Sequence, residues 1–101
     1  MQEHAPFAET PIGQVTHYWS HLGVAGVHLN APLDVDDHIH IAGHTSDLEQ
    51  RVTSIEMDHN PMPHAEANAD VGIEVADHVR EHDTVYRMVE LADVGANEVA
   101  M

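Results

Sequence analysis

The stretch LEQRVTSIEMDH, residues 48–59, carries the strongest fold signal in this chain. Val52 and Ile55 are both suited to a hydrophobic core, yet they lie three residues apart, so the strict alternation of a strand cannot bury both. Alternation that starts at Ile55 also buries Met57, which suits the second half of the run. We therefore predict a change of phase near residues 53–54, of the kind that a β-bulge produces. The bend that accompanies a bulge favours a small, curved sheet.

Short extended segments separated by turn signals make up most of the remaining chain. Helix is disfavoured, because no window of about eleven residues keeps apolar side chains at i, i+3 and i+4 without a proline or a turn cluster. The expected strands cover residues 12–19, 22–30, 37–43, 48–59, 71–75 and 84–91. This pattern predicts an all-β fold, a small closed six-stranded antiparallel β-barrel. We place the domain at residues 11–91, between flexible tails at 1–10 and 92–101.

The charge balance is the most unusual property of the composition. The chain has 18 acidic residues against three arginines and no lysine, and its formal net charge is −15 with histidine neutral. Such a surface repels phosphate backbones, so we expect no direct nucleic-acid binding at low salt. The composition is typical of cytosolic proteins of extreme halophiles, and an acidic mesophilic protein is the alternative. The halophile interpretation predicts that the unfolding midpoint climbs with salt, because the Debye length falls to about 3 Å at 1 M.

Several function classes are excluded or disfavoured. The length of 101 residues points to one domain. Without cysteine, disulfides, thiolate zinc sites and thiol catalysis are impossible. A chain without lysine cannot build a P-loop, and neither a G-x-S-x-G elbow nor an H-E-x-x-H motif is present. We therefore expect a protein that is not an enzyme. No apolar run approaches about 20 residues and no signal peptide is visible, which favours a cytoplasmic location.

A histidine pair is the strongest candidate for a metal site. In DDHIHIAGH, residues 36–44, His38 and His40 flank Ile39, so on a strand both imidazoles face solvent while Ile39 faces the core. Two such imidazoles can chelate a transition metal, and His44 or a neighbouring aspartate could add a ligand. However, the chain has 11 histidines spread along its whole length. The simplest interpretation is that histidine occupies solvent positions where lysine usually stands, with no cofactor and only adventitious Zn or Ni binding.

Three further residues are candidates for contacting a partner. Tyr18 and Trp19 end the first expected strand. If exposed, they would mark a protein-binding surface, because aromatic residues are enriched at binding hot spots. Arg80 is one of three basic residues in a very acidic chain and could mark a contact point. An ion pair of Arg80 with Glu81 or Asp83 inside its own turn is the simpler interpretation.

Parts of the chain resemble a known β-barrel. The segments VTSI (52–55), ANADVGI (67–73) and VREHDTVY (79–86) are similar to the second domain of translational GTPases of the elongation factor Tu type. The chain looks closest to a stand-alone group of translation elongation factor-like proteins, and similar modules occur at the C-terminus of a family of collagenase-like peptidases. The resemblance covers about residues 12–88. It implies the fold more strongly than the function.

The same resemblance implies special turns. Related barrels usually have glycine at the positions of Asp36, Asn68 and His82, each just before a strand, where a positive φ is needed. Aspartate, asparagine and histidine are the other residue types that tolerate this geometry best. We therefore expect these turns to persist with positive φ at a modest cost each.

Three functions stay open at this point. The first is a non-catalytic binding module that docks on a protein or ribonucleoprotein partner. The second is a histidine-rich protein that binds a metal or a small ligand. The third is an accessory domain for a peptidase acting in trans.

Overall fold

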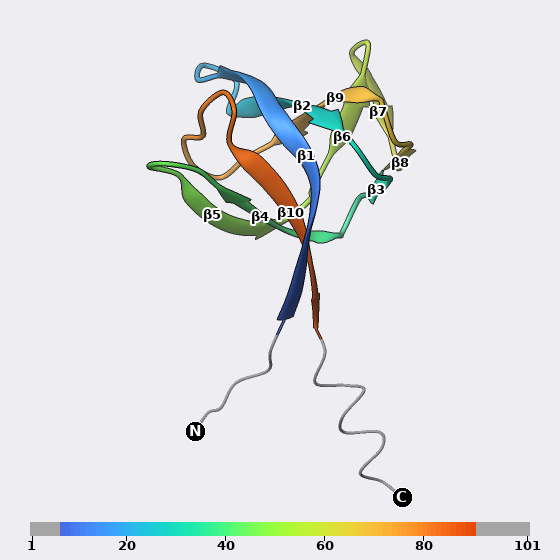
Figure 1. Ribbon diagram of the computed structural model, residues 1–101. Coiled ribbons are helices and arrows are strands. Elements are labelled where there is room, and N and C mark those ends of the chain that lie inside the picture. Colours follow the sequence, from blue (N-terminus) through green and yellow to red (C-terminus); the bar gives the residue numbers. More distant parts are fainter. Residues whose placement is uncertain (1–6, 91–101) are drawn as a thin grey trace, which may run out of the picture.

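A computed structural model of the chain describes residues 7–90 (Figure 1). These residues form ten β-strands and no helix. The strands are β1 (Phe7–Trp19), β2 (Val24–Leu29), β3 (Leu33–Asp34), β4 (His38–Ala42), β5 (Asp47–Arg51), β6 (Ile55–Met57), β7 (Asn60–Met62), β8 (His64–Ala65), β9 (Asp70–Glu74) and β10 (Thr84–Glu90). The all-β class is confirmed. The described part of the chain accordingly contains no helix that could span a bilayer.

One large sheet dominates the fold. Eight strands pair in the order β5-β4-β10-β1-β2-β9-β6-β7, while β3 and β8 form a separate two-stranded sheet. All of these pairs are antiparallel. The large sheet curls around a shared interior (Figure 1). Its edge strands β5 and β7 do not pair with each other, so the expected closed barrel of six strands is not confirmed. Strands β3, β7 and β8 are too short for the sequence pattern to reveal, and β7 contains Pro61, which an edge strand tolerates.

Strand β1 is irregular at two places, and this lets each of its halves pair with a different neighbour. Its first half pairs with β10, with a shift of register between Pro11 and Gly13. Its second half pairs with β2, with a further shift between Val15 and His17. Each irregularity adds local twist, as bulges do. The chain can therefore curl without breaking its central strand.

The N-terminal boundary differs from expectation. Residues 7–10, assigned to the flexible tail, belong to β1, and Phe7 is paired with Glu90. Together with the end of β10 they form a two-stranded arm that extends from the curled body (Figure 1). The remainder of the expected tails, residues 1–6 and 92–101, lies outside the described residues.

The pattern of buried residues changes phase within residues 48–59 as predicted, but a β-bulge is not the cause. Val52 and Ile55 are both buried. However, the chain leaves the sheet at residues 52–54, and β5 pairs with β4 whereas β6 pairs with β9 and β7. The single bulged strand that we expected is therefore two strands, β5 and β6, which pair with different neighbours. A bulge keeps the same neighbour, whereas here the chain crosses from one neighbour to another.

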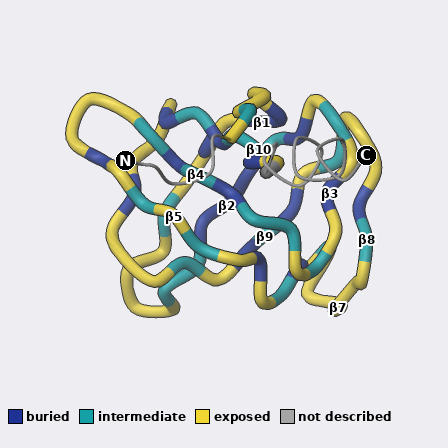
Figure 2. The backbone as a smooth tube through the Cα atoms, turned by 90° about the horizontal axis from the view of Figure 1, so that it is seen from below, coloured by how far each residue is buried: buried dark blue, intermediate teal, exposed yellow. Residues whose placement is uncertain are grey.

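The core is aliphatic, as the low aromatic content requires. The residues expected to face the core, Ile39, Val52 and Ile55, are all buried, and Ile73 and Val85 are buried with them. Figure 2 shows the buried segments (dark blue) around the interior and the exposed segments (yellow) in the peripheral loops.

The predicted turn geometry is confirmed. Asp36, Asn68 and His82 have positive φ, at 83°, 73° and 77°. The amide of Asn68 donates to the carbonyl of Leu29, and the amide of His82 donates to the carbonyl of Val15. These turns are therefore anchored by backbone hydrogen bonds to strands that are distant in the sequence.

Candidate functional site

A groove of about 450 Å³ crosses the outer face of the curled sheet over β2, β9 and β6. On its floor, Gly26 of β2 is paired with Gly72 of β9, and Gly72 is paired with Glu56 of β6. The neighbours Ala25 and Ile73 are buried, so the two glycines face outward. Because neither glycine has a side chain, the indole of Trp19 can lie over Gly26, which it helps to bury, and the surface stays low at Gly72. We call this feature, lined on one side by Trp19, the Trp19 groove.

Trp19 forms one wall of the groove. Its side chain is 44% exposed, and a Cβ at Gly26 would lie 3.2 Å from its Cζ3 atom. The ring of His17 packs against the indole with centroids 4.4 Å apart. Leu22, 69% exposed, extends the same wall. The wall thus presents an aromatic ring and a branched apolar side chain to solvent.

The turn between β1 and β2 holds this wall in place. The amides of Leu22 and Gly23 both donate to the carbonyl of Trp19, at 3.1 and 2.9 Å. Gly23 has φ 65°, which few other residues would adopt without strain. Its carbonyl accepts from the amide of Val75 at 2.9 Å, which ties the turn to the end of β9. The apolar wall is therefore preorganised.

The opposite side of the groove is acidic. Glu56, Asp58 and Asp70 line it together with His59. Asp58 and His59 form the two-residue turn between β6 and β7, and both have positive φ (51° and 67°), the pattern of a type I′ hairpin. The carboxylate of Asp70 is bound by Nδ1 of His28 at 2.8 Å. The carboxylates of Glu56 and Asp58 receive no hydrogen bond or ion pair from the described part of the chain.

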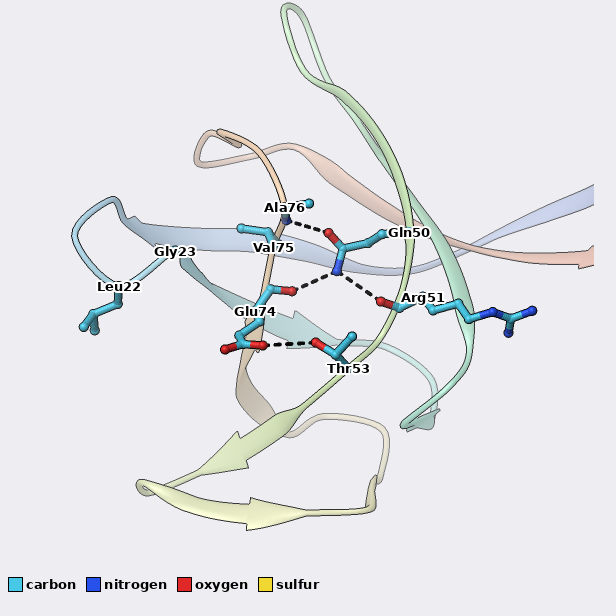
Figure 3. A pocket seen from close by; sticks show the side chains of 8 residues that line it. All are labelled: Leu22, Gly23, Gln50, Arg51, Thr53, Glu74, Val75 and Ala76. Atoms are coloured by element: carbon cyan, nitrogen blue, oxygen red, sulfur yellow. Dashed lines mark hydrogen bonds between the residues drawn. The ribbon is translucent and has the colours of Figure 1, made fainter.

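A second hollow, of about 420 Å³, lies between β5 and β9 (Figure 3). The carboxamide of Gln50 bridges it: Nε2 donates to the carbonyl of Glu74 at 2.9 Å, and Oε1 accepts from the amide of Ala76 at 2.7 Å. These two bonds flank Val75 as a neighbouring backbone residue would in a parallel ladder. We call this second hollow, across which side chains replace the backbone pairing of β5 with β9, the seam.

The seam adjoins the Trp19 groove. Thr53 adds a second side-chain link by donating to a carboxylate oxygen of Glu74 at 3.1 Å. Leu22 lines both hollows, and in Figure 3 its side chain points away from the bridging carboxamide. The polar groups of the seam are therefore satisfied internally, whereas the groove keeps unpaired ones.

The structure places His40, a predicted metal ligand, between two carboxylates. Its Nδ1 lies 3.0 Å from Glu9 and its Nε2 lies 2.6 Å from Asp47, and the side chain is only 17% exposed. Burial by itself lowers the pKa of His40, but the hydrogen bonds and charges of Glu9 and Asp47 outweigh it, so the pKa is raised above 6.5. The two acids sit on opposite edges of the ring and leave neither nitrogen free for a metal.

The other two predicted ligands have different surroundings. His38 packs edge-on against Phe7 with ring centroids 5.7 Å apart, and its Nε2 lies 3.9 Å from Glu49. His44 is exposed in the turn that follows β4. Within residues 7–90, no group of three or more His, Cys, Asp or Glu side chains could hold a metal ion. The metal hypothesis receives no support from this geometry and stays a prediction.

Tyr18 and Arg80, predicted as partner contacts, line one shallow hollow of about 520 Å³. Tyr18 is half-buried and packs edge-on against His78 with centroids 4.6 Å apart. The Nε of Arg80 donates to Thr45 at 2.9 Å. The backbone amide of Arg80 donates to the carboxylate of Asp83 at 2.8 Å, and its carbonyl accepts from the amide of Asp83 at 3.1 Å. The guanidinium forms no ion pair with Asp83 or Glu81, so the simpler interpretation of an ion pair inside the turn was wrong. The expected aromatic pair is split between two surfaces.

Sequence reasoning singled out Trp19 but missed Gly26, Gly72 and Gln50. The available signal was a glycine in the middle of each of two strand-like segments, VAGVHL and DVGIE, because strand glycines often mark a close approach of another group. Their pairing, which creates the groove, depends on register and cannot be seen in one sequence.

The described geometry defines a class, the small all-β modules built on one strongly curled sheet. Within it, the C-terminal domain of a Geobacillus thermoleovorans protein assigned to the U32 peptidases is similar, with a TM-score of 0.72 and 18% identity, covering 77% of this chain and 91% of that domain. The selenomethionine variant of that domain matches with a TM-score of 0.70 and 19% identity, over 74% and 95%. At this identity the likeness shows the fold alone. No protein-family model and no curated protein matches the chain.

The expected kinship with the elongation factor Tu barrel was wrong. The two solved structures described above are C-terminal domains of a U32 peptidase, not domains of an elongation factor. The segments that carried the resemblance specify turns and strands, and such local geometry is not particular to one family. Shared turn chemistry is therefore a guide to the fold and a poor guide to the family.

Proposed function

We propose that this chain is an accessory binding module for a peptidase, with no catalytic activity of its own, which docks through the Trp19 groove. The observation that carries the proposal is the coverage of the match. The chain reproduces 91% of the C-terminal domain of the U32 peptidase, so the likeness extends over that unit rather than over one motif. A domain that forms the C-terminal part of one peptidase can act as a separate chain that binds another peptidase in trans. It can also act as one domain of a longer chain.

The surroundings of the histidines favour a role other than catalysis. His40 holds carboxylates at both ring nitrogens, and so does His64, with Asp34 at 2.5 Å and Glu66 at 2.7 Å. An imidazole engaged on both sides has no nitrogen left to accept a proton from a nucleophile. These histidines balance charge on an acidic surface.

The Trp19 groove has the properties of a docking site. It combines an exposed tryptophan, a frequent binding hot spot, with a wall fixed by backbone hydrogen bonds. A rigid site loses little conformational freedom when a partner binds. The groove is also long enough to cross three strands, which suits a protein segment better than a small compact ligand.

The proposal is tested by binding this chain to a U32-type peptidase encoded in the same genome, in salt from about 0.1 to 3 M. We expect saturable binding and a changed KM of the peptidase for a peptide substrate. Trp19→Ala should weaken binding about tenfold, because the indole supplies most of the apolar wall. Met62→Ala is the matched control, since Met62 is also an exposed apolar residue but lines a different hollow. Absence of binding at every salt concentration contradicts the accessory role, and equal binding by Trp19→Ala contradicts the groove.

A further inference from the structure

We infer that the Trp19 groove binds an extended protein segment that carries arginine or lysine, with the cationic group held between Trp19 and the carboxylates of Glu56 and Asp58. This inference rests on the proposed function and defines its partner chemically.

The first support is the shape of the groove. Adjacent strands are about 4.8 Å apart, so Glu56 stands about 10 Å across the sheet from Gly26, over which the indole lies. Between them the floor is bare backbone at Gly72. The apolar stem of an arginine or lysine can lie on this floor while its charged end reaches the acidic side.

The second support is charge that nothing inside the described chain neutralises. All three arginines lie elsewhere: Arg51 donates to the carbonyl of Asp36, Arg80 donates to Thr45, and Arg87 donates to the carbonyl of Pro32 and pairs with Asp37. The chain has no lysine. Apart from the imidazole of His59, no basic side chain of residues 7–90 lies at the groove.

The third support is the pairing of an aromatic face with acids. A cation over the face of a tryptophan gains about 0.5–2 kcal/mol, depending on how far it is desolvated. The carboxylates on the opposite side of the groove from Trp19 attract the same cation from the other direction. A purely apolar segment would instead cover Glu56 and Asp58 without pairing them, which is costly. An acidic segment would be repelled by a chain with net charge −15.

The acidic side is as fixed as the apolar wall. Asp58 stands in the type I′ turn, whose two positive φ values restrict its backbone. Glu56 lies on β6, which is paired on both sides, with β9 and with β7. The backbone positions from which the two carboxylates extend are thus fixed before a ligand binds.

The probe is an end-blocked heptapeptide, Gly-Ala-Arg-Ala-Arg-Ala-Gly, compared with the same peptide in which glutamine replaces arginine. Trp19 is the only tryptophan of the chain, so its fluorescence reports directly on the groove. We expect the arginine peptide to shift the emission of Trp19 in a saturable way. The glutamine peptide should bind at least tenfold more weakly.

The double variant Glu56→Gln/Asp58→Asn should weaken the arginine peptide about tenfold. A closely matched control exists in Glu49→Gln/Asp36→Asn. It removes the same charge from one strand glutamate and one aspartate of positive φ, outside the groove. We expect less than a twofold effect from the control.

Some results would overturn the inference. Binding that leaves Trp19 emission unchanged, or equal losses in the two double variants, would show diffuse attraction to an acidic surface. Spermidine that binds the groove as tightly as the peptide would show that a protein segment is not required. A peptidase that binds this chain but is not displaced by the arginine peptide would refute the inference and leave the proposed function intact. A groove that binds the peptide while no peptidase binds the chain would refute the proposed function alone.

Discussion

The seam and the Trp19 groove are two hollows of similar size, and Leu22 lines both of them. A polar side chain bridges the first, whereas no side chain bridges the second. At the seam, Gln50 fills the gap and satisfies the carbonyl of Glu74 and the amide of Ala76. At the groove, Trp19 covers Gly26, and Gly72 beside it stays without a covering side chain. The difference shows that an interruption of a sheet can serve stability or binding, according to which side chain is placed there. The predictions that follow test this division.

The largest expected effect is on stability, at the seam. Gln50→Glu removes the donor to the carbonyl of Glu74 and brings a carboxylate toward that oxygen. We expect a loss of about 2 kcal/mol in the free energy of unfolding, because one hydrogen bond is lost and a carboxylate is brought to face a carbonyl oxygen. Urea denaturation measures it, and Glu49→Gln, the exposed neighbour, is the control at less than about 0.5 kcal/mol. Affinity for the arginine peptide should stay within twofold, and a large loss of affinity would remove the division between the two hollows.

Next in size is an effect on binding, at the groove. Gly72→Leu places a side chain on the floor, and its Cβ would lie 3.3 Å from Cγ1 of Val24, which must shift slightly. We expect about a tenfold loss of peptide affinity, equal to about 1.4 kcal/mol, with a smaller change in unfolding free energy. Gly72→Ala should have an intermediate effect, since it fills less space. If neither substitution changes the affinity, the floor is not the binding surface.

A smaller effect on stability is expected at His40. Its ring pairs with Asp47 at the start of β5, the strand that borders the seam. Its folded-state pKa is raised above 6.5, so its contribution to stability is full below that pH and is lost as pH rises through the folded pKa. The stability advantage of the wild-type chain over His40→Gln should therefore shrink between about pH 6 and pH 8, by up to about 1 kcal/mol. Paired urea titrations at each pH would show it.

His64 provides the control for this titration. Its hydrogen bonds to Asp34 and Glu66 outweigh desolvation and also raise its pKa, but the side chain is 41% exposed. Solvent screens such pairs, so His64→Gln should show the same sign with a smaller slope. A larger slope for His64 would mean that the partial burial of His40 does not strengthen its ion pairs.

The smallest expected effect lies in the turns, outside both hollows. His82→Gly should raise the unfolding free energy by about 0.5 kcal/mol, because glycine adopts φ 77° without the side-chain penalty. Asn68→Gly should change it less, since asparagine tolerates this geometry better. Thermal denaturation resolves both, and peptide affinity should stay constant. A loss of stability in His82→Gly would mean that its side chain matters more than its backbone.

Local signals in the sequence carried much of the fold. The burial of Ile39, Val52, Ile55 and Ile73 follows from alternation and from one change of phase, both of which are visible in the residues. The positive φ of Asn68 follows from residue type and position. What could not be predicted depends on register. Whether the sheet closes, and which strand β6 joins, are decided by contacts between segments that lie far apart in the chain.

The candidate site was less predictable than the fold. Trp19 was visible as an aromatic residue at a strand end, but its ring lies over Gly26 only because of the shifted register of β1 and β2. The position of His40 between Glu9 and Asp47 was not predicted, because Glu9 was assigned to a flexible tail. Gln50 looked like an ordinary exposed strand residue, since nothing local shows that β9 lies opposite.

The way in which Gln50 completes the sheet also determines how the molecule can open. No backbone ladder joins β5 to β9, so separating them costs a few side-chain hydrogen bonds rather than a row of main-chain ones. Ile39 and Ile41 of β4 are fully buried, so the hydrophobic core rather than main-chain pairing keeps this line closed. Because no backbone ladder crosses this line, we expect amide hydrogens beside it to exchange with solvent before those between β1, β2 and β9.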